Sequence, residues 1–238
     1  MRSDGRENLE ARIIEIETGY QPLPEGSALI AWGETRVLCS ATIENRIPFF
    51  LNGTRSGWVT AEYDMLPGSG NRRIRRDRGV SIKGRTLEIQ RIIGRSLRQS
   101  LDLHRLGERT ITIDCDVLVA DGGTRVASIV GGCVALRLAL KRLLVDGRLT
   151  DDPFLGYVGA ISLGLFGEEI LADLSYEEDS GAIMDMNVVA DSRGRLIELQ
   201  ASAEGGAVPP ETVSSMTTIA IDTILRHVIP LQMEATSE

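Results

Sequence analysis

Residues 124–145 constrain the fold of this chain more than any other stretch. The spacing of apolar side chains predicts a helix over this range, and those side chains lie on nearly all sides of it. A helix without a continuous polar face has to be buried among other elements. Because Arg137, Lys141 and Arg142 interrupt its most apolar part, this helix is not expected to span a membrane.

Short runs of alternating apolar and polar residues predict strands before and after this helix. The runs at 12–18, 27–32 and 35–43 are separated by short turns, which is typical of an antiparallel meander. The second half repeats the order of strands followed by a helix. We therefore expect an α+β fold in which mixed sheets pack against helices, forming one compact domain (1–238) with two similar halves, about 1–150 and 151–238. The other predicted strands are 111–119, 156–166, 170–174, 182–190 and 196–201, and the other predicted helices are 86–103 and 210–226.

Composition excludes several classes of protein. With 238 residues, 42% of them hydrophobic and 25% charged, the chain has the composition of a soluble globular protein. The N-terminal residues include no apolar leader, so a cytoplasmic protein is expected. The cysteines Cys39, Cys115 and Cys133 lie far apart within apolar runs and are expected to be buried packing residues rather than disulfide partners or zinc ligands. The chain has only two histidines, which disfavours a catalytic triad.

The segment 120–125, Ala-Asp-Gly-Gly-Thr-Arg, joins a predicted strand to the central helix. Two consecutive glycines allow backbone N–H groups to converge on one point, and the helix adds the positive end of its dipole. Arg125 adds a guanidinium suited to phosphate oxygens. The segment lacks the Gly-x-x-x-x-Gly-Lys-Ser/Thr pattern of a nucleotide P-loop. It is therefore either a site for a smaller anion or only a tight connection.

Charge divides unevenly along the chain. Residues 1–150 carry 23 basic and 18 acidic residues, a net charge of +5, whereas residues 151–238 carry 3 basic and 16 acidic residues, a net charge of −13.

Residues 67–79, called the basic segment below, are rich in glycine and contain five arginines. The segment is either a solvated charge run or a clamp for a phosphate backbone. Aromatic residues make up only 4% of the chain, so such binding is expected to be independent of base sequence. The five arginines are Arg72, Arg73, Arg75, Arg76 and Arg78.

Two carboxylates in the second half form a candidate pair. Asp185 starts a strand whose apolar residues alternate inward, so its side chain is expected on the opposite face, and Asp179 lies in the preceding turn. Such a pair can hold Mg²⁺ or donate a proton to a leaving oxygen, and an acidic surface loop is the alternative. Asp114 and Asp116 are a competing pair, although their spacing is more typical of an exposed polar face. Arg85, just ahead of the predicted helix 86–103, is either a second anion ligand or the end of the basic segment.

Together these segments resemble the ribonuclease PH family of phosphorolytic 3′-to-5′ exoribonucleases over nearly the whole chain. The resemblance implies that Arg85 and the residues Gly123, Thr124 and Arg125 bind phosphate, and that Asp179 and Asp185 are the functional aspartates. It places RNA contacts on Arg73 and Arg76. After Pro67 the chain departs from the family, because Gly68-Ser69-Gly70 replaces the usual Arg-Ala-Thr and one family arginine is lost. The segments that carry the resemblance are 2–6, 57–67, 84–89, 94–98, 106–111, 114–118, 120–125, 185–187 and 203–205.

The resemblance implies an enzyme that uses inorganic phosphate as co-substrate, with Mg²⁺ as a further expected ligand of Asp179 and Asp185. Such an enzyme would use phosphate to remove nucleotides from the 3′ ends of tRNA precursors and other RNA, including rRNA. The reaction would release nucleoside diphosphates and would be reversible. RNA and further copies of the chain are the expected partners, the latter in a hexamer built as a trimer of dimers, with no membrane or DNA partner. Two rivals stay open at this point. One is a catalytically silent RNA-binding ring subunit, and the other is a small-molecule kinase with a related fold.

Overall fold

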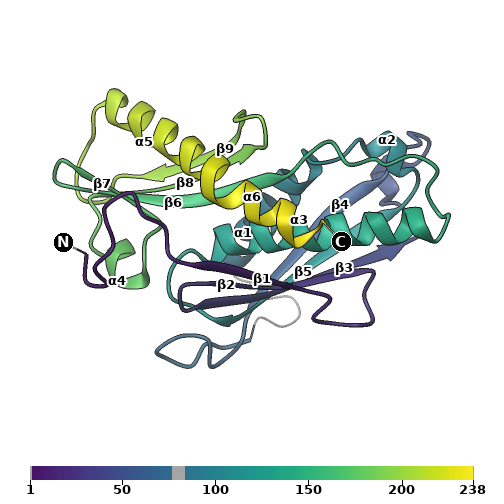
Figure 1. Ribbon diagram of the computed structural model, residues 1–238, viewed down its shortest axis with the longest axis horizontal. Helices are drawn as coiled ribbons and strands as arrows, with labels where there is room; N and C mark the ends of the chain where they lie inside the picture. The colour runs from purple at the N-terminus through teal and green to yellow at the C-terminus, as the bar shows by residue number, and fades with distance from the viewer. Residues whose placement is uncertain (1, 77–83, 238) are drawn as a thin grey trace.

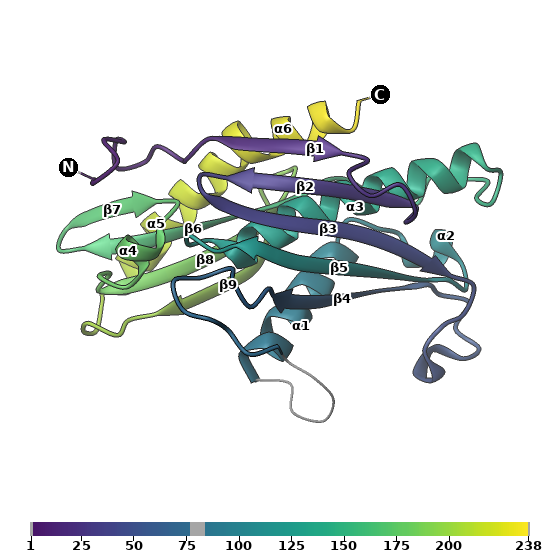
Figure 2. The same cartoon turned by 90° about the horizontal axis from the view of Figure 1, so that it is seen from below.

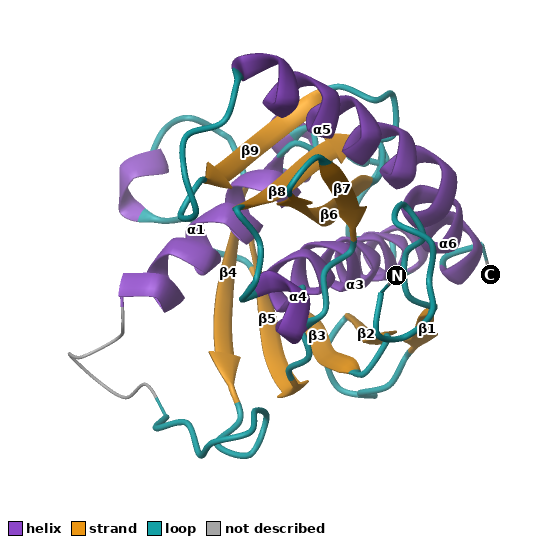
Figure 3. Ribbon diagram, turned by 90° about the vertical axis from the view of Figure 1, so that its left-hand side faces the viewer, coloured by secondary structure: helices purple, strands orange, loops and turns teal. Residues whose placement is uncertain are grey.

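The computed structural model describes residues 2–76 and 84–237, which form two sheets and two layers of helices. Figure 3 shows the order of the layers: a five-stranded sheet, then α1 and α3, then a four-stranded sheet, then α5. The predicted α+β class is therefore confirmed. The elements are β1 (Ile14–Thr18), β2 (Gly26–Trp32), β3 (Thr35–Glu44), η1 (Phe49–Leu51), β4 (Trp58–Met65), α1 (Gly84–Arg98), α2 (Leu103–Leu106), β5 (Thr110–Val119), α3 (Thr124–Val145), β6 (Val158–Phe166), β7 (Glu169–Ala172), α4 (Tyr176–Asp179), β8 (Met184–Asp191), β9 (Leu196–Ser202), α5 (Pro210–Thr223), η2 (Ile224–Val228) and α6 (Ile229–Ala235).

The first sheet has the strand order β1-β2-β3-β5-β4. Strands β1, β2 and β3 form the predicted antiparallel meander, and β5 continues the antiparallel pairing. Strand β4 pairs with β5 in parallel, from Trp58 opposite Thr110 to Met65 opposite Val117. Because parallel strands end at the same edge of a sheet, the basic segment that follows β4 and the glycine loop that follows β5 leave the sheet side by side (Figure 2).

Helix α3 lies between the two sheets, as its apolar surface requires (Figure 1). It spans the predicted residues, and it contacts β2, β3 and β5 of one sheet and β6 of the other. Ile129, Cys133 and Leu136 are inaccessible to solvent. The buried core is therefore continuous from the first sheet through α3 into the second. The other two cysteines, Cys39 and Cys115, are also buried and unpaired, as predicted.

The second sheet has the order β7-β6-β8-β9 and is antiparallel throughout. Helix α5 covers the face turned away from α3 and begins at Pro210, as predicted. The helix does not end near Arg226 as predicted, because a π-helical turn, η2, connects it to α6. Pro230 follows that turn, and its missing N–H and bulky ring would otherwise interrupt a regular α-helix.

Two local predictions near the candidate site differ from the structure. The helix predicted over 86–103 is shorter, since α1 ends at Arg98 and Leu101 instead forms a β-bridge with Phe154. Arg85 lies in the first turn of α1 rather than ahead of it. Asp179 is the last residue of the short helix α4, where a turn was expected. Among the residues that the structure describes, no helix combines the length and the apolar character needed to cross a membrane.

Candidate active site

The glycine loop between β5 and α3 is held in a conformation that few other residues could adopt. Gly122 and Gly123 have φ angles of +74° and +66°, in the left-handed region that favours glycine. The Thr35 hydroxyl fixes the loop to β3, since it donates to the Gly122 carbonyl (2.7 Å) and accepts from the Asp121 amide (2.9 Å). The loop therefore presents the N-terminus of α3, with its unpaired amides and positive dipole end, at a fixed place.

That N-terminus opens into a cavity of about 830 Å³ between the two halves of the chain. The first half contributes cationic and N–H-bearing groups from α1 and the glycine loop, and the second half contributes carboxylates and amides from α4, β8 and β9. All six residues predicted for the phosphate and aspartate sites line this cavity: Arg85, Gly123, Thr124, Arg125, Asp179 and Asp185.

The two aspartates reach the cavity from different elements. Asp185 lies on β8, where Met184 and Met186 turn into the core and Asp185 faces the cavity, as predicted from their alternation. Asp179 comes from the end of α4. Burial and the neighbouring charge of Asp185 raise the pKa of Asp179, while Arg85 and Arg125 act in the opposite direction. The two carboxylates therefore influence each other across the cavity that both of them line.

Arg125 is oriented by a chain of hydrogen bonds that joins the two halves. Its guanidinium donates to the side-chain oxygen of Gln200 on β9. The side-chain nitrogen of Gln200 in turn donates to Glu88 Oε1 on α1, at 2.8 Å. Sequence reasoning missed Glu88 and Gln200, although Glu88 is one helical turn after Arg85. Gln200 lies opposite Asn187 only through the β8–β9 register, which no local pattern reveals.

Thr124 has a hydroxyl partner that the sequence also did not indicate. Tyr63 on β4 is 4% exposed, and its hydroxyl lies 3.0 Å from Thr124 Oγ1. Burial raises the pKa of Tyr63, against the hydrogen bond with Thr124 and the charge of Arg85. The phenol is therefore neutral and can orient the Thr124 hydroxyl toward the cavity.

The described part of the basic segment does not line the cavity. Arg72, Arg73, Arg75 and Arg76 are all exposed, and none of them lines the cavity. Arg78 falls among residues 77–83, which lie outside the described residues. Burial and the charge of Asp64 raise the pKa of Asp116 on β5, and the charge of Arg76 acts in the opposite direction. The segment thus borders the same sheet edge from which the glycine loop emerges.

The arrangement has a definite chemical capacity. A helix N-terminus and two guanidiniums can hold a small, multiply charged oxyanion, and two carboxylates face that position from the other half. The described residues contain no group of three or more His, Cys, Asp or Glu side chains placed to bind a metal ion. Two carboxylates nevertheless fit Mg²⁺, because this ion is commonly bound by one or two carboxylates together with substrate phosphates.

Comparison with known proteins gives a consistent result. Residues 10–141 match the first domain of the 3′ exoribonuclease family, and residues 156–223 match its second domain. The chain is 48% identical over 240 residues to the Ribonuclease PH of Bacillus pumilus, which covers 100% of this chain and 99% of that protein. It is 51% identical over 221 residues to the Ribonuclease PH of Roseobacter denitrificans, covering 92% of this chain and 93% of that protein.

Solved structures share the fold at low sequence identity. Rice (Oryza sativa) Rrp46 superimposes with a TM-score of 0.75 at 19% identity, covering 96% of this chain and all of that one. The Archaeoglobus fulgidus exosome with RNA bound to the active site gives a TM-score of 0.76 at 21% identity, covering 93% of this chain and 89% of that one.

Proposed function

Because the chain belongs to the ribonuclease PH family and is a phosphate-dependent 3′-to-5′ exoribonuclease, we propose that the cavity between its two halves is the active site. One observation carries the proposal. The cavity brings together an anion-binding helix terminus, two arginines and two aspartates from separate parts of the chain. These are the groups that transfer of a nucleotide from RNA to inorganic phosphate requires.

Inorganic phosphate binds at the N-terminus of α3 in this proposal. Arg85 and Arg125 neutralise its charge, and the Thr124 hydroxyl and the loop amides donate hydrogen bonds to it. A phosphate oxygen attacks the phosphorus of the last phosphodiester of the RNA, forming the new P–O bond. The bond from that phosphorus to the 3′ oxygen of the preceding nucleotide breaks, which releases a nucleoside diphosphate. No protein nucleophile is required, so catalysis consists of positioning and charge neutralisation.

The departing 3′ oxygen needs a proton, and in this proposal Asp179 supplies it. Because its pKa is raised, Asp179 holds a proton at a higher pH than an ordinary aspartate. In the alternative role, Asp179 and Asp185 would hold Mg²⁺, whose charge would stabilise the negative charge that develops on the reacting oxygens.

The exposed arginines of the basic segment are proposed to hold the RNA backbone upstream of the reacting end. Arg73 and Arg76 are the residues of first interest, and the segment leaves the sheet beside the glycine loop. Replacing both by alanine should weaken RNA binding and reduce the salt dependence of log K by about 0.7 for each lost phosphate contact. The control is replacement of Arg226, which is also exposed but lies on η2 and pairs with Asp222. Unchanged salt dependence in the double variant would exclude this role.

The activity assay uses a tRNA with extra 3′ nucleotides, incubated with and without phosphate. Release of nucleoside diphosphates only in the presence of phosphate is expected. Arg125→Ala should lower that rate roughly tenfold to a thousandfold, because it removes a charge-assisted contact to the reacting anion. The control is Arg142→Ala on the same helix, whose side chain instead pairs with Asp146 at 3.3 Å. A wild-type rate for Arg125→Ala under saturating phosphate would disprove the phosphate site.

The substrate, assembly and location of the enzyme are further parts of the proposal. We take the 3′ ends of tRNA precursors as substrate, a cytoplasmic location, and a hexamer built as a trimer of dimers. A silent RNA-binding subunit is disfavoured, because Arg85, Arg125, Asp179 and Asp185 are all present and line one cavity. Light scattering tests the assembly, and a monomer at micromolar concentration would rule out the ring.

A further inference from the structure

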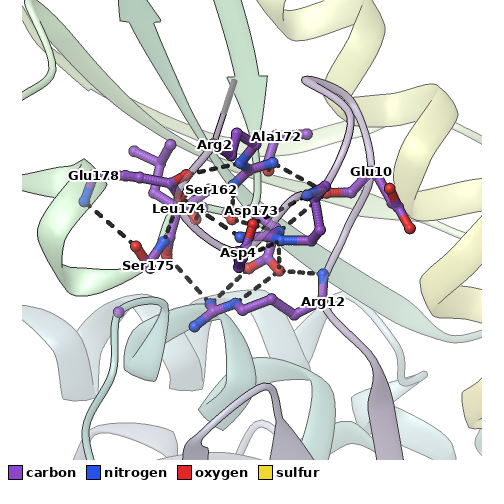
Figure 4. Close-up of polar contacts among 12 residues, drawn as sticks. Arg2, Asp4, Glu10, Arg12, Ser162, Ala172, Asp173, Leu174, Ser175 and Glu178 are labelled. Carbon is purple, nitrogen blue, oxygen red and sulfur yellow. Dashed lines mark hydrogen bonds and ion pairs between the residues drawn. The ribbon is translucent and has the colours of Figure 1, made fainter.

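Three arginines of the N-terminal arm, defined as residues 2–12, converge on the connection between β7 and α4 (Figure 4). This connection, residues 173–175, leads directly into the helix that ends at Asp179. Arg2 and Arg12 are 6% and 8% exposed, and Arg6 joins them through hydrogen bonds to Asp173. Buried arginines are rare in proteins, and their position beside the active-site cavity calls for an explanation.

Arg12 connects the second half to the glycine loop. Its side chain and backbone amide surround the fully buried carboxylate of Asp173, with Nη2 to Oδ1 at 2.7 Å, Nε to Oδ2 at 2.9 Å and the amide to Oδ2 at 2.7 Å. The other side of the same guanidinium donates to the Asp121 carbonyl, at the start of the glycine loop. Burial would lower the pKa of Arg12, but the hydrogen bonds and charge of Asp173 outweigh burial and raise it. The guanidinium is therefore a permanent, fixed link between the two segments.

Arg2 fixes the short helix that carries Asp179. Its Nε and Nη2 each donate to one oxygen of Glu178 at 2.7 Å, and its Nη1 and Nη2 also donate to the carbonyls of Ala172 and Asp173 at 2.8 Å. Glu178 in turn accepts from the Ser175 amide at 2.9 Å, which completes the capping box of α4. Glu178 is the residue before Asp179. The orientation of α4 is thus set from both ends by side chains that do not enter the cavity.

We propose that Arg2 and Arg12 are positioning residues, which hold Asp179 opposite the phosphate-binding glycine loop through Glu178 and Asp173. The inference rests on the proposed active site and adds to it the element that sets its geometry. A role in stability alone explains it less well. Buried ion pairs often contribute little net stability compared with apolar packing, whereas they specify one geometry through fixed, directional hydrogen bonds.

The test variant is Arg2→Lys, which keeps the charge but loses the two-pronged contact with Glu178. We expect kcat for phosphate-dependent diphosphate release to fall roughly tenfold to a hundredfold, as a displacement of about 1 Å at a reacting group does. The KM for phosphate should stay within about twofold, because Arg2 acts on α4 and not on Arg85 or the glycine loop, which bind phosphate in this proposal. Arg137→Lys is the matched control, since Arg137 also forms a 2.7 Å ion pair, but its partner is Asp152 rather than a residue of α4.

A double-mutant cycle separates positioning from general loss of structure. If Arg2 acts through Asp179, Arg2→Lys should cost little further activity in an Asp179→Asn background. An equal loss in both backgrounds, or no loss in the wild-type background, overturns the inference. Glu178→Gln, which retains the capping box, gives the same readout should Arg2→Lys fold poorly. A wild-type rate for Asp179→Asn alone would instead overturn the active-site assignment, and the inference with it.

Discussion

A methyl group at Gly122 should separate the two halves of the active site. A Cβ added there would lie 2.4 Å from the Leu174 carbonyl oxygen and 2.7 Å from the Ser175 carbonyl carbon. Both atoms belong to the backbone, so no side-chain rotation can relieve the contact. Ordinary contact begins near 3.4 Å, so the glycine loop has to move away from the connection to α4 by roughly 1 Å. That displacement would change the distance between Asp179 and the residues of the glycine loop that are proposed to bind phosphate.

The expected losses for Gly122→Ala can be stated separately for stability and activity. A left-handed φ costs alanine about 1–2 kcal/mol, and the overpacked contact adds about 1–3 kcal/mol to the loss of unfolding free energy. A displacement of about 1 Å at the reacting groups should lower kcat/KM about a hundredfold, which corresponds to about 2.7 kcal/mol of transition-state stabilisation.

Gly53→Ala is the matched control for this variant. Gly53 also has a left-handed φ, +81°, but an added Cβ would have no atom within 4 Å, and the residue does not line the cavity. It should therefore show the backbone penalty alone, with wild-type kcat/KM. Urea unfolding followed by circular dichroism gives the stability difference, and phosphate-dependent diphosphate release gives the activity. If Gly122→Ala were as active as Gly53→Ala, the contact between the loop and residues 174–175 would not set the catalytic geometry.

Three further predictions concern ionisation and cooperativity. Burial alone would raise the pKa of Glu178, but the hydrogen bonds from Arg2 and the Ser175 amide lower it. The ionised Glu178 therefore stabilises the folded protein above about pH 4.5, the ordinary glutamate value, and this contribution is lost as the pH falls through the pKa of the folded state. Urea titrations should therefore show a smaller loss of stability on acidification for Glu178→Gln than for the wild type, and an equal loss would contradict this. Asp185→Asn should shift the pKa of Asp179 down toward its ordinary 3.8, as measured by carboxyl ¹³C NMR, and an unchanged value would exclude the coupling. The only two tryptophans, Trp32 and Trp58, lie in the first half, so tryptophan fluorescence reports the unfolding of that half. Because the core is continuous, this fluorescence should change at the same urea concentration as circular dichroism, which reports the whole chain. Separate transitions would indicate two domains.

Elements with a strong local pattern were predictable from the sequence. Helix α3 and strands β2, β3 and β5 lie where periodicity placed them, because each has a regular apolar face and is bounded by glycine or polar turns. The end of α1 was not predictable, because it is decided by the pairing of Leu101 with Phe154, more than fifty residues away in the chain. The continuation of α5 into α6 depends on a π-helical turn, for which periodicity gives no indication.

The candidate site divides in the same way. The residues of the glycine loop predicted either an anion site or a tight connection, and strand alternation predicted the side on which Asp185 lies. The proposed phosphate role of Arg85 came from the family resemblance. The place of Gln200 at the cavity could not be predicted, because it depends on the register between β8 and β9. The Arg12–Asp173 pair joins residues 161 positions apart, and neither residue stands out locally. Contacts of this kind follow from tertiary structure alone.

The charge distribution gives a physical reason for a separate positioning element at the proposed active site. The cavity sets arginines of the first half against aspartates of the second, and these opposite charges attract each other more strongly in a partly buried cavity than in water. Among the described residues no ion pair joins Arg85 or Arg125 to Asp179 or Asp185, although both arginines influence the pKa of Asp179. The N-terminal arm restrains α4 through Glu178 and Asp173, which limits how far Asp179 can approach the arginines. Opposite charges are thereby kept near each other but apart, and phosphate can occupy the space between them.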